Sequence, residues 1–405
     1  MKQGASVAVL GAGIMGSATA LFLARRGVRV VLFDAAAEPF TGASRWNEGK
    51  IHLGYLYSAD RSLDTAERLL PGGLAFKGLT ESLIGKSLDP AVTLHDDTYL
   101  VHRDSVTGVD AMQRYIRAVT VLATSHPDAA EYLIDLRHAE TRRLAKAELE
   151  AAYDTRTVLA GFRVPERSIS TTWVADCFVD AIHSESVIEL AVPRRIMAVQ
   201  PTRGSLDGPF IIQTEDGSEG PFDFVVNALW EGRLAIDAGL GIRPPARWSH
   251  RYRLSIFLRT RTEVAVPSSV LATGPFGDIK NYDGTNLYLS WYPAGLVAEG
   301  EDVQPPAVPR MEDVDHQRIE GEVVDQLGRV IHAVRDLRGN VEETRVRGGW
   351  VFAIGTGSLA DPAATLHRRD QIGIQRTGAY VSVDTGKYSI APWLARQVAD
   401  SVIDG

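Results

Sequence analysis

The sequence predicts an α/β fold with two parts, and three observations carry this prediction. Residues 7–33 read as strand, turn, helix and strand, the opening unit of a parallel sheet. Residues 248–297 contain alternating runs rich in β-formers, which is typical of an antiparallel sheet. Residues 346–403 return to a strand followed by an apolar helix. We therefore expect a parallel-sheet domain into which a mainly antiparallel sheet domain is inserted.

Composition narrows the possible classes of protein. The chain has 405 residues, 45% of them hydrophobic, which is enough for two globular domains. Its net charge of -8 disfavours nucleic acid and anionic lipid as general partners. The single cysteine, Cys177, cannot form an internal disulfide or a Cys-rich zinc site, and the histidines show no ligand spacing, so we expect no metal. We read Cys177 as a buried thiol, with a thioether to a cofactor as the alternative.

The uncharged stretch Ser6–Ala24 is not read as a signal peptide or a membrane span. Glycines interrupt it, and a β-like run precedes them while a helical run, Ile14–Arg26, follows. No other stretch approaches the roughly 20 apolar residues of a membrane helix. We therefore expect a cytoplasmic protein without a membrane span.

The turn Gly11-Ala12-Gly13-Ile14-Met15-Gly16 is a G-x-G-x-x-G phosphate turn between the first strand and the first helix. Its glycines allow a tight turn, close approach to a pyrophosphate and close helix–strand packing. The second strand, Val28–Phe33, ends in Asp34, at the spacing where a carboxylate accepts hydrogen bonds from an adenosine ribose. A carboxylate there disfavours NADP, so the turn leaves NAD and FAD open. The first part is thus predicted to be a Rossmann-like dinucleotide-binding domain.

Residues 41–57 read TGASRWNEGKIHLGYLY, a polar loop where an NAD domain would continue with another strand and helix. This segment resembles the D-amino-acid oxidase superfamily of FAD-dependent oxidoreductases, and its IHLG ending looks closest to the L-2-hydroxyglutarate and glycerol-3-phosphate dehydrogenase branches. The chain departs from the pattern at Ala35 and at Trp46-Asn47-Glu48. The resemblance implies FAD as cofactor. It implies flavin contacts at Ser44, Arg45, Asn47, Gly49, Lys50, Ile196 and Ala228, besides Gly11, Gly13, Ile14, Met15, Gly16 and Asp34.

The C-terminal segment Tyr380–Pro392 reads as a strand, a small-residue turn and the start of a helix. Proline is tolerated in a first helical turn, and a helix N-terminus stabilises negative charge on a reduced flavin. The turn is similar to the closing G-x-x-x-A-P motif of the same superfamily, although it carries Lys387 and Tyr388. It implies further flavin contacts at Gly386, Lys387, Tyr388 and Ser389.

The remaining patterns complete the predicted order of elements. We expect strands at 98–102, 188–192, 195–199, 222–229, 253–259, 287–292 and 346–354, and helices at 110–124, 144–153, 168–182 and 313–335. The expected FAD-binding domain comprises residues 1–100, 165–245 and 345–405. The expected substrate domain, a sheet roofing the flavin, comprises residues 101–164 and 246–344.

The resemblance implies oxidation of a C–O or C–N bond of a small polar substrate, with transfer of a hydride from the carbon to flavin N5. The expected substrate is a hydroxy acid, a sugar-like alcohol or an amino acid. His52 is the candidate base, since the motif places it on the substrate side; a structural histidine or a covalent flavin link is the alternative. Lys50 is a second candidate near the flavin ring, with a solvated or pyrophosphate-side lysine as the alternative. Arg253 and Tyr292 are the candidate substrate anchors, with Lys280 and Tyr288 also considered, and each has a surface position as its alternative.

Two other functions stay open. A non-catalytic nucleotide-binding protein could keep this fold, and an NAD-dependent dehydrogenase would share the phosphate turn but leaves residues 42–52 unexplained. A flavin hydroxylase is disfavoured because the GADG-like turn is absent. If the protein is an FAD-dependent oxidoreductase, the expected electron acceptor is oxygen, a quinone or another protein.

Overall fold

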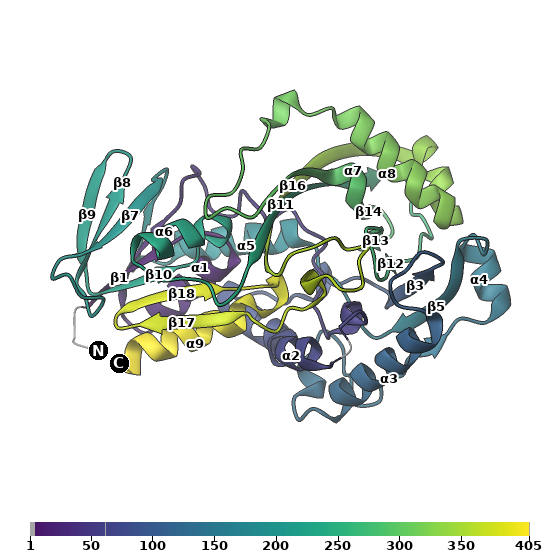
Figure 1. The fold of residues 1–405 in the computed structure, drawn as a ribbon, viewed down its shortest axis with the longest axis horizontal. Helices are drawn as coiled ribbons and strands as arrows, with labels where there is room; N and C mark the ends of the chain where they lie inside the picture. The colour runs from purple at the N-terminus through teal and green to yellow at the C-terminus, as the bar shows by residue number, and fades with distance from the viewer. Residues whose placement is uncertain (1–4, 61, 405) are drawn as a thin grey trace.

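The computed structural model describes residues 5–60 and 62–404, whose strands form three sheets (Figure 1). The first is a six-stranded sheet that is parallel except at one edge, where β17 runs antiparallel to β18. From that edge its strands are β17 (Gly373–Thr377), β18 (Tyr380–Asp384), β10 (Phe224–Asn227), β1 (Ser6–Leu10), β2 (Arg29–Phe33) and β6 (Ile188–Ala191). The predicted parallel sheet is confirmed.

Both faces of this sheet are covered, which explains why β1 is apolar throughout. Val7 and Val9 belong to the core on the side of four helices, and Ala8 and Leu10 belong to the core on the opposite side. The helices are α1 (Ile14–Ala24), α2 (Asp64–Ile84), α5 (Thr171–Ser184) and α9 (Ala391–Asp404). The opposite side holds a three-stranded sheet of β7 (Ile196–Pro201), β8 (Phe210–Thr214) and β9 (Gly217–Phe222), together with α6 (Arg233–Gly239).

The third sheet has nine strands and is mainly antiparallel, as predicted; β12 runs parallel to β3. Its order is β15 (Leu296–Gly300), β11 (Trp248–Thr260), β14 (Asn286–Trp291), β13 (Gly277–Asn281), β12 (Ser269–Leu271), β3 (Asp97–His102), β5 (Val158–Val164) and β4 (Arg142–Arg143), and β16 (Val341–Ile354) pairs with β11. Helix α8 (His316–Val330) packs on this sheet through an apolar face that includes Ile319, Val323 and Leu327 (Figure 1). The other helices are α3 (Val109–Ser125), α4 (Lys146–Ala152) and the short α7 (Tyr292–Gly295).

Several elements differ from the predictions. The helix expected at 313–335 ends at Val330, and a 3-10 helix, His332–Asn340, follows it. Tyr292 begins α7 instead of ending a strand. The sequence patterns gave no prediction for α2, which contains Pro71. Strands β3 and β16 both lie in the nine-stranded sheet, and the proposed division into two domains stays a prediction.

Three features bear on the predictions about Cys177, a metal site and a membrane span. Cys177 is buried on α5 within the core that packs on the six-stranded sheet. Over residues 5–60 and 62–404, no group of three or more His, Cys, Asp or Glu side chains is placed to hold a metal ion. In the same part of the chain, no helix combines the length and apolarity needed to cross a bilayer.

Candidate active site

The phosphate turn has the tight geometry that its glycines predict. Gly11 has a φ of 97°, and a Cβ added there would lie 2.7 Å from the carbonyl oxygen of Ala228. A Cβ on Gly16 would lie 1.8 Å from the carbonyl oxygen of Gly11. Any side chain at either position would force β1, β10 and α1 apart. The N-terminus of α1 therefore stands at the carboxyl edge of β1, and a helix N-terminus favours a bound phosphate group.

Asp34 and Ser44 hold the two sides of this turn. The Asp34 carboxylate accepts hydrogen bonds from the backbone N–H of Ala12 at 2.8 Å and of Ala36 at 2.9 Å. The Ser44 hydroxyl accepts one from the N–H of Ile14, the first residue of α1, at 3.0 Å. Both side chains thus lie beside the phosphate turn, where a bound dinucleotide would meet them.

Arg45 and Asn47 build the loop that follows. The Arg45 guanidinium donates to the Phe40 carbonyl at 3.0 Å and to the Asp176 carboxylate at 2.7 Å. The Asn47 amide donates to the Ala43 carbonyl at 2.8 Å and accepts from the N–H of Gly49 at 2.8 Å. These bonds engage both side chains within the loop, so a direct contact of either with a cofactor stays a prediction.

Lys50 is buried, with 3% of its surface exposed, so a solvated lysine is the wrong interpretation. Its ammonium lies 5.6 Å from the centre of the Tyr99 ring. Burial lowers its pKa, but the carboxylates of Asp278, Asp97 and Glu166 outweigh that effect and raise the pKa of Lys50. The raised pKa keeps the buried Lys50 ammonium charged at neutral pH.

His52 is buried and uncharged. Burial lowers its pKa far below the usual value, and the nearby charges of Lys387 and Lys50 lower it further. Its Nδ1 has no hydrogen-bond partner among the described residues, and its ring centre lies 5.9 Å from that of Tyr57. A neutral imidazole can take up a proton transiently in a reaction step, although the lowered pKa of His52 means that it does not hold that proton at neutral pH.

The closing turn after β18 brings a second lysine to the same place. Gly386 donates its N–H to the Asp384 carboxylate at 3.0 Å, and the ammonium of Lys387 lies 5.7 Å from the centre of the Tyr57 ring. Burial and the charge of Arg369 lower the pKa of Lys387 to about 7. The hydroxyls of Tyr388 and Ser389 are buried and have no hydrogen-bond partner within residues 5–60 and 62–404. The turn thus offers several free polar groups next to His52.

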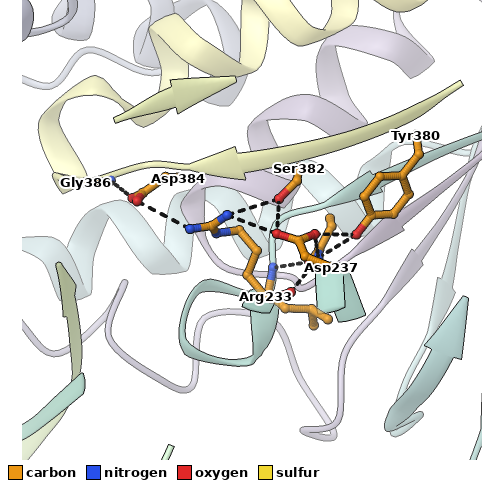
Figure 2. A network of polar contacts seen from close by, with 8 residues as sticks. Arg233, Asp237, Tyr380, Ser382, Asp384 and Gly386 are labelled. Atoms are coloured by element: carbon orange, nitrogen blue, oxygen red, sulfur yellow. Dashed lines mark hydrogen bonds and ion pairs between the residues drawn. The ribbon is translucent and has the colours of Figure 1, made fainter. Parts of the chain in front are cut away.

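A buried polar network joins this closing turn and β18 to α6 (Figure 2). Arg233 donates to Asp237 at 3.1 Å and to Asp384 at 3.4 Å, and Asp384 in turn holds the N–H of Gly386. Asp237 also accepts hydrogen bonds from the hydroxyls of Tyr380 and Ser382 at 2.7 Å each. The closing turn is therefore held to α6 by charged hydrogen bonds through Asp384.

The segment after β10 approaches the phosphate turn from the other side. Ala228 contacts Gly11 as described, and the Trp230 indole N–H donates to the Trp350 carbonyl of β16 at 2.8 Å. Burial raises the pKa of Glu231 to about 7, with the negative charge of Asp34 as a further cause. Ile196, predicted at the adenine, begins β7 in the three-stranded sheet, and its contact with a cofactor stays a prediction.

The nine-stranded sheet contributes Arg253 and Tyr292. The Arg253 guanidinium carbon lies 4.2 Å from the centre of the Tyr292 ring, and its Nε is buried without a hydrogen-bond partner. Lys280 is fully buried in an ion pair with Asp97, and Tyr288 shares a hydrogen bond with Ser255 at 2.9 Å. The structure therefore brings Arg253 and Tyr292 together and shows that the surface alternative is wrong for Lys280.

The sequence patterns did not identify three further residues near this site, which are Arg251, Arg369 and Tyr57. Arg251 donates to the Tyr292 hydroxyl at 2.8 Å, and its Nε and Nη2 have no partner. The spacing of Arg251 and Arg253, two residues apart on one strand, was a usable signal because such residues share a face. Arg369 lies in the irregular segment between β16 and β17, and this segment has no periodic sequence pattern from which an element could be predicted.

The residues present fit a bound dinucleotide with a redox ring. Buried polar groups in folded proteins nearly always have partners, so unpartnered ones that gather in one place indicate a ligand. Among the described residues, unpartnered buried atoms belong to His52, Tyr57, Arg251, Arg253, Tyr388 and Ser389, and also to residues outside this set such as Thr80, Arg233 and His250. The phosphate turn is continuous with this place through residues 41–52 and through the closing turn.

Comparison with known proteins agrees with this geometry. A family description, DAO, FAD dependent oxidoreductase, matches residues 6–354. No curated protein sequence matches the chain. Among solved structures, the fold resembles glycine oxidase from Geobacillus kaustophilus, with a TM-score of 0.67 and 13% identity over 100% of this chain and 95% of that one.

Two further structures share the fold. Iminodiacetate oxidase from Chelativorans sp. BNC1 has a TM-score of 0.66 and 17% identity over 98% of this chain and 95% of that one. L-alpha-glycerophosphate oxidase from Mycoplasma pneumoniae, solved with FAD bound, has a TM-score of 0.65 and 14% identity over 100% and 96%. With the family match and the cradle described above, FAD is the cofactor, and the chain belongs to the DAO family of FAD-dependent oxidoreductases.

Proposed function

We propose that the protein oxidises the C–O bond of a small anionic alcohol, such as a hydroxy acid, with His52 as the base. The observation that carries the proposal is the neutral, buried His52 with a free Nδ1 among cationic side chains. FAD, when bound, supplies an acceptor for the hydride at its N5. The phosphate turn, Asp34, Ser44 and the closing turn are the residues that would hold it.

The role of His52 follows from what each substrate class needs. An alcohol loses a hydroxyl proton together with its hydride, and a neutral imidazole accepts that proton. An amine has to be neutral before oxidation and needs no base afterwards. The surrounding lysines and arginines keep His52 uncharged, and they stabilise the alkoxide character that develops on the substrate oxygen.

Arg253 and Tyr292 orient the substrate in this proposal. The guanidinium of Arg253 has a free Nε, and a carboxylate accepts paired hydrogen bonds from such a group. Anchoring the anionic end leaves the carbon to be oxidised within reach of both His52 and the cofactor. The substrate is then bound between the nine-stranded sheet and the closing turn, which excludes bulk water from His52.

Oxidation of an amine is the second candidate. The fold itself does not choose, because proteins named for glycine and for L-alpha-glycerophosphate share it. Glu48 favours the amine reading, since Lys50, Lys387 and Arg253 outweigh the effect of burial and lower its pKa, so an ionised carboxylate is available for a substrate ammonium. The two candidates make different predictions for a 2-hydroxy acid and the 2-amino acid of the same carbon skeleton, because each predicts that a different one of the two is oxidised.

The test is anaerobic bleaching of the protein-bound flavin by 2-hydroxy acids and by the 2-amino acids of the same carbon skeletons. Bleaching by hydroxy acids supports alcohol oxidation, and bleaching by amino acids alone replaces it with amine oxidation. A flavin that dithionite bleaches but no member of either series does would contradict both candidates and favour a non-catalytic role. Readmission of air then tests the acceptor, because rapid return of colour identifies oxygen, whereas slow return leaves a quinone or a protein.

A further inference from the structure

The segment that carries His52 is anchored through its backbone on both sides. The N–H of Leu53 donates to the carboxylate of Glu166 across 2.7 Å, and the carbonyl of Ile51 accepts from the hydroxyl of Tyr132 across 2.6 Å. Glu166 and Tyr132 are both buried, and they come from parts of the chain far from residue 52. The residues immediately before and after His52 are therefore each held by a buried side chain.

The imidazole of His52 has no comparable partner at its Nδ1. The residue is 2% exposed, and this nitrogen has no hydrogen-bond partner within residues 5–60 and 62–404. A histidine base is usually oriented by a hydrogen bond to its second ring nitrogen. Without that bond, the place of the ring depends on the backbone of residues 51–53 and on packing. Helix α2 supplies part of the packing, since a Cβ on Gly73 would lie 2.3 Å from the carbonyl oxygen of His52.

Glu166 is the stronger of the two anchors. Its Oε1 holds the N–H of Leu53, and its Oε2 accepts from the hydroxyl of Tyr99 across 2.5 Å. Both partners are donors, and an ionised carboxylate accepts such bonds more strongly than a neutral group does. The backbone of Glu166 is fixed as well, because its carbonyl accepts from the N–H of Asp97 on β3 at 3.0 Å. The carboxylate thus links the nine-stranded sheet to residues 51–53.

We propose that Glu166 is the positioning residue for His52, with its carboxylate holding the Leu53 N–H so that the imidazole stays within reach of the substrate proton. The inference rests on the proposed function, in which His52 is the base, and it gives Glu166 no contact with the substrate. A base transfers a proton within about 2.6–3.2 Å, and a displacement of about 1 Å is enough to slow a reaction roughly hundredfold. Loss of this anchor should therefore slow flavin reduction and leave substrate binding unchanged.

Glu166→Gln and Glu166→Asp separate positioning from an effect of charge. The glutamine keeps the length of the side chain and one carbonyl oxygen for the Leu53 N–H, but it removes the charge. The aspartate keeps the charge but is one methylene shorter, so its carboxylate is withdrawn from that N–H. Positioning predicts a limiting rate within about threefold of wild type for Glu166→Gln and at least about tenfold lower for Glu166→Asp. A rate in Glu166→Asp that equals or exceeds the rate in Glu166→Gln would overturn the proposal.

The measurement is the single-turnover rate of anaerobic flavin bleaching at equal FAD content, over a range of concentrations of the best 2-hydroxy acid. The half-saturating concentration should stay within about twofold of wild type in both variants, since Glu166 touches no substrate. Tyr153→Phe is the matched control, because it removes a buried hydrogen bond to Ser269 on β12 and should leave rate and half-saturation unchanged. A rate loss there as large as in Glu166→Asp would overturn the proposal, because the loss of any buried bond would then suffice.

A double variant distinguishes failure of this inference from failure of the proposed function. If Glu166 acts through His52, Glu166→Asp should not lower the residual rate of His52→Ala any further. Losses that multiply in the double variant would contradict the role of Glu166 and leave His52 as the base.

A wild-type rate in His52→Ala alone would remove the proposed function, and a readout without turnover then decides the inference. This readout is the His52 ring signal in NMR spectra of the oxidised holo-protein, identified by its absence in His52→Ala. A signal displaced in Glu166→Asp but not in Glu166→Gln would sustain the positioning role of Glu166. A signal unchanged in both variants would overturn it.

Discussion

Arg251 donates a hydrogen bond to the hydroxyl of Tyr292 across 2.8 Å and thereby joins strand β11 to the first residue of α7. The bond uses one of the guanidinium nitrogens, and Nε and Nη2 stay without partners. The nine-stranded sheet thus presents an oriented, unsatisfied cation to the place where the six-stranded sheet presents the cofactor cradle. The predictions below test each part of that arrangement.

Asp34→Ala should weaken FAD binding by about tenfold to hundredfold, because hydrogen bonds to a charged acceptor contribute roughly 1.5–3 kcal/mol. Asp34→Asn should weaken it less, since an amide oxygen still accepts the N–H of Ala12. Fluorescence titration of the apo-protein with FAD measures the dissociation constant, and Asp207→Ala, at an exposed aspartate, is the control. An unchanged dissociation constant in Asp34→Ala would remove the ribose role.

Arg233→Met should lower the free energy of unfolding by about 3–5 kcal/mol, because it leaves the buried carboxylates of Asp237 and Asp384 unpaired. Arg194→Met is the matched control. It breaks exposed pairs with Asp216 and Glu219, and such pairs contribute about 0–1 kcal/mol. Denaturant unfolding of both apo-proteins gives the comparison, and similar losses in the two variants would show that the network is not stabilising.

Glu231 should make the apo-protein less stable as pH rises. Its pKa is raised from 4.5 to about 7, so between these values the folded state binds more protons than the unfolded state, and the free energy of unfolding falls with pH. Glu231→Gln should remove this decline, whereas Glu263→Gln, at an exposed position, should keep it. Thermal unfolding at pH 5 and pH 8 provides the data. A wild-type decline that persists unchanged in Glu231→Gln would be the contrary result.

Lys387 should make anion binding depend on pH. With its pKa lowered to about 7, the side chain is neutral above that pH in the free site, and a bound anion then has to recruit a proton. The affinity for a simple carboxylate such as butyrate should fall by up to about tenfold per pH unit above pH 7. Lys387→Met should bind butyrate more weakly below pH 7 and show a flat profile above it. Titrations from pH 6 to pH 9 compare the two proteins.

The parts of the fold that follow local rules were predictable from sequence. The phosphate turn, Asp34 and the closing turn depend on short motifs whose backbone geometry is encoded in neighbouring residues. Helix α2 was not predictable in the same way, because Pro71, Gly72 and Gly73 read as helix breakers. The structure explains this conflict, since a Cβ on Gly73 would lie 2.3 Å from the carbonyl oxygen of His52. The glycine weakens the helix pattern but lets α2 pack against the backbone of His52.

Only part of the candidate site was predictable from the sequence, because the charges that act on its residues come from distant parts of the chain. His52 and Lys50 lie in a recognisable loop, but their electrostatic states depend on charges far away in sequence, such as Lys387 and Asp278. Arg369 reaches the site from an irregular segment that carries no periodic pattern. Tertiary packing decides which cations are paired and which stay free for a ligand, and no local rule contains that information.

The most direct test of the central claim, that His52 is the base beside the flavin, is the single-turnover rate of flavin bleaching in wild type and in His52→Ala at equal FAD content. The anaerobic reaction is followed at roughly 450 nm with the best substrate of the hydroxy-acid series. We predict a rate about 10²–10⁴-fold lower in His52→Ala, with a wild-type rate that falls only well below pH 6.5, where His52 becomes charged. An equal rate in the two proteins across this pH range would contradict the assignment of His52 as the base.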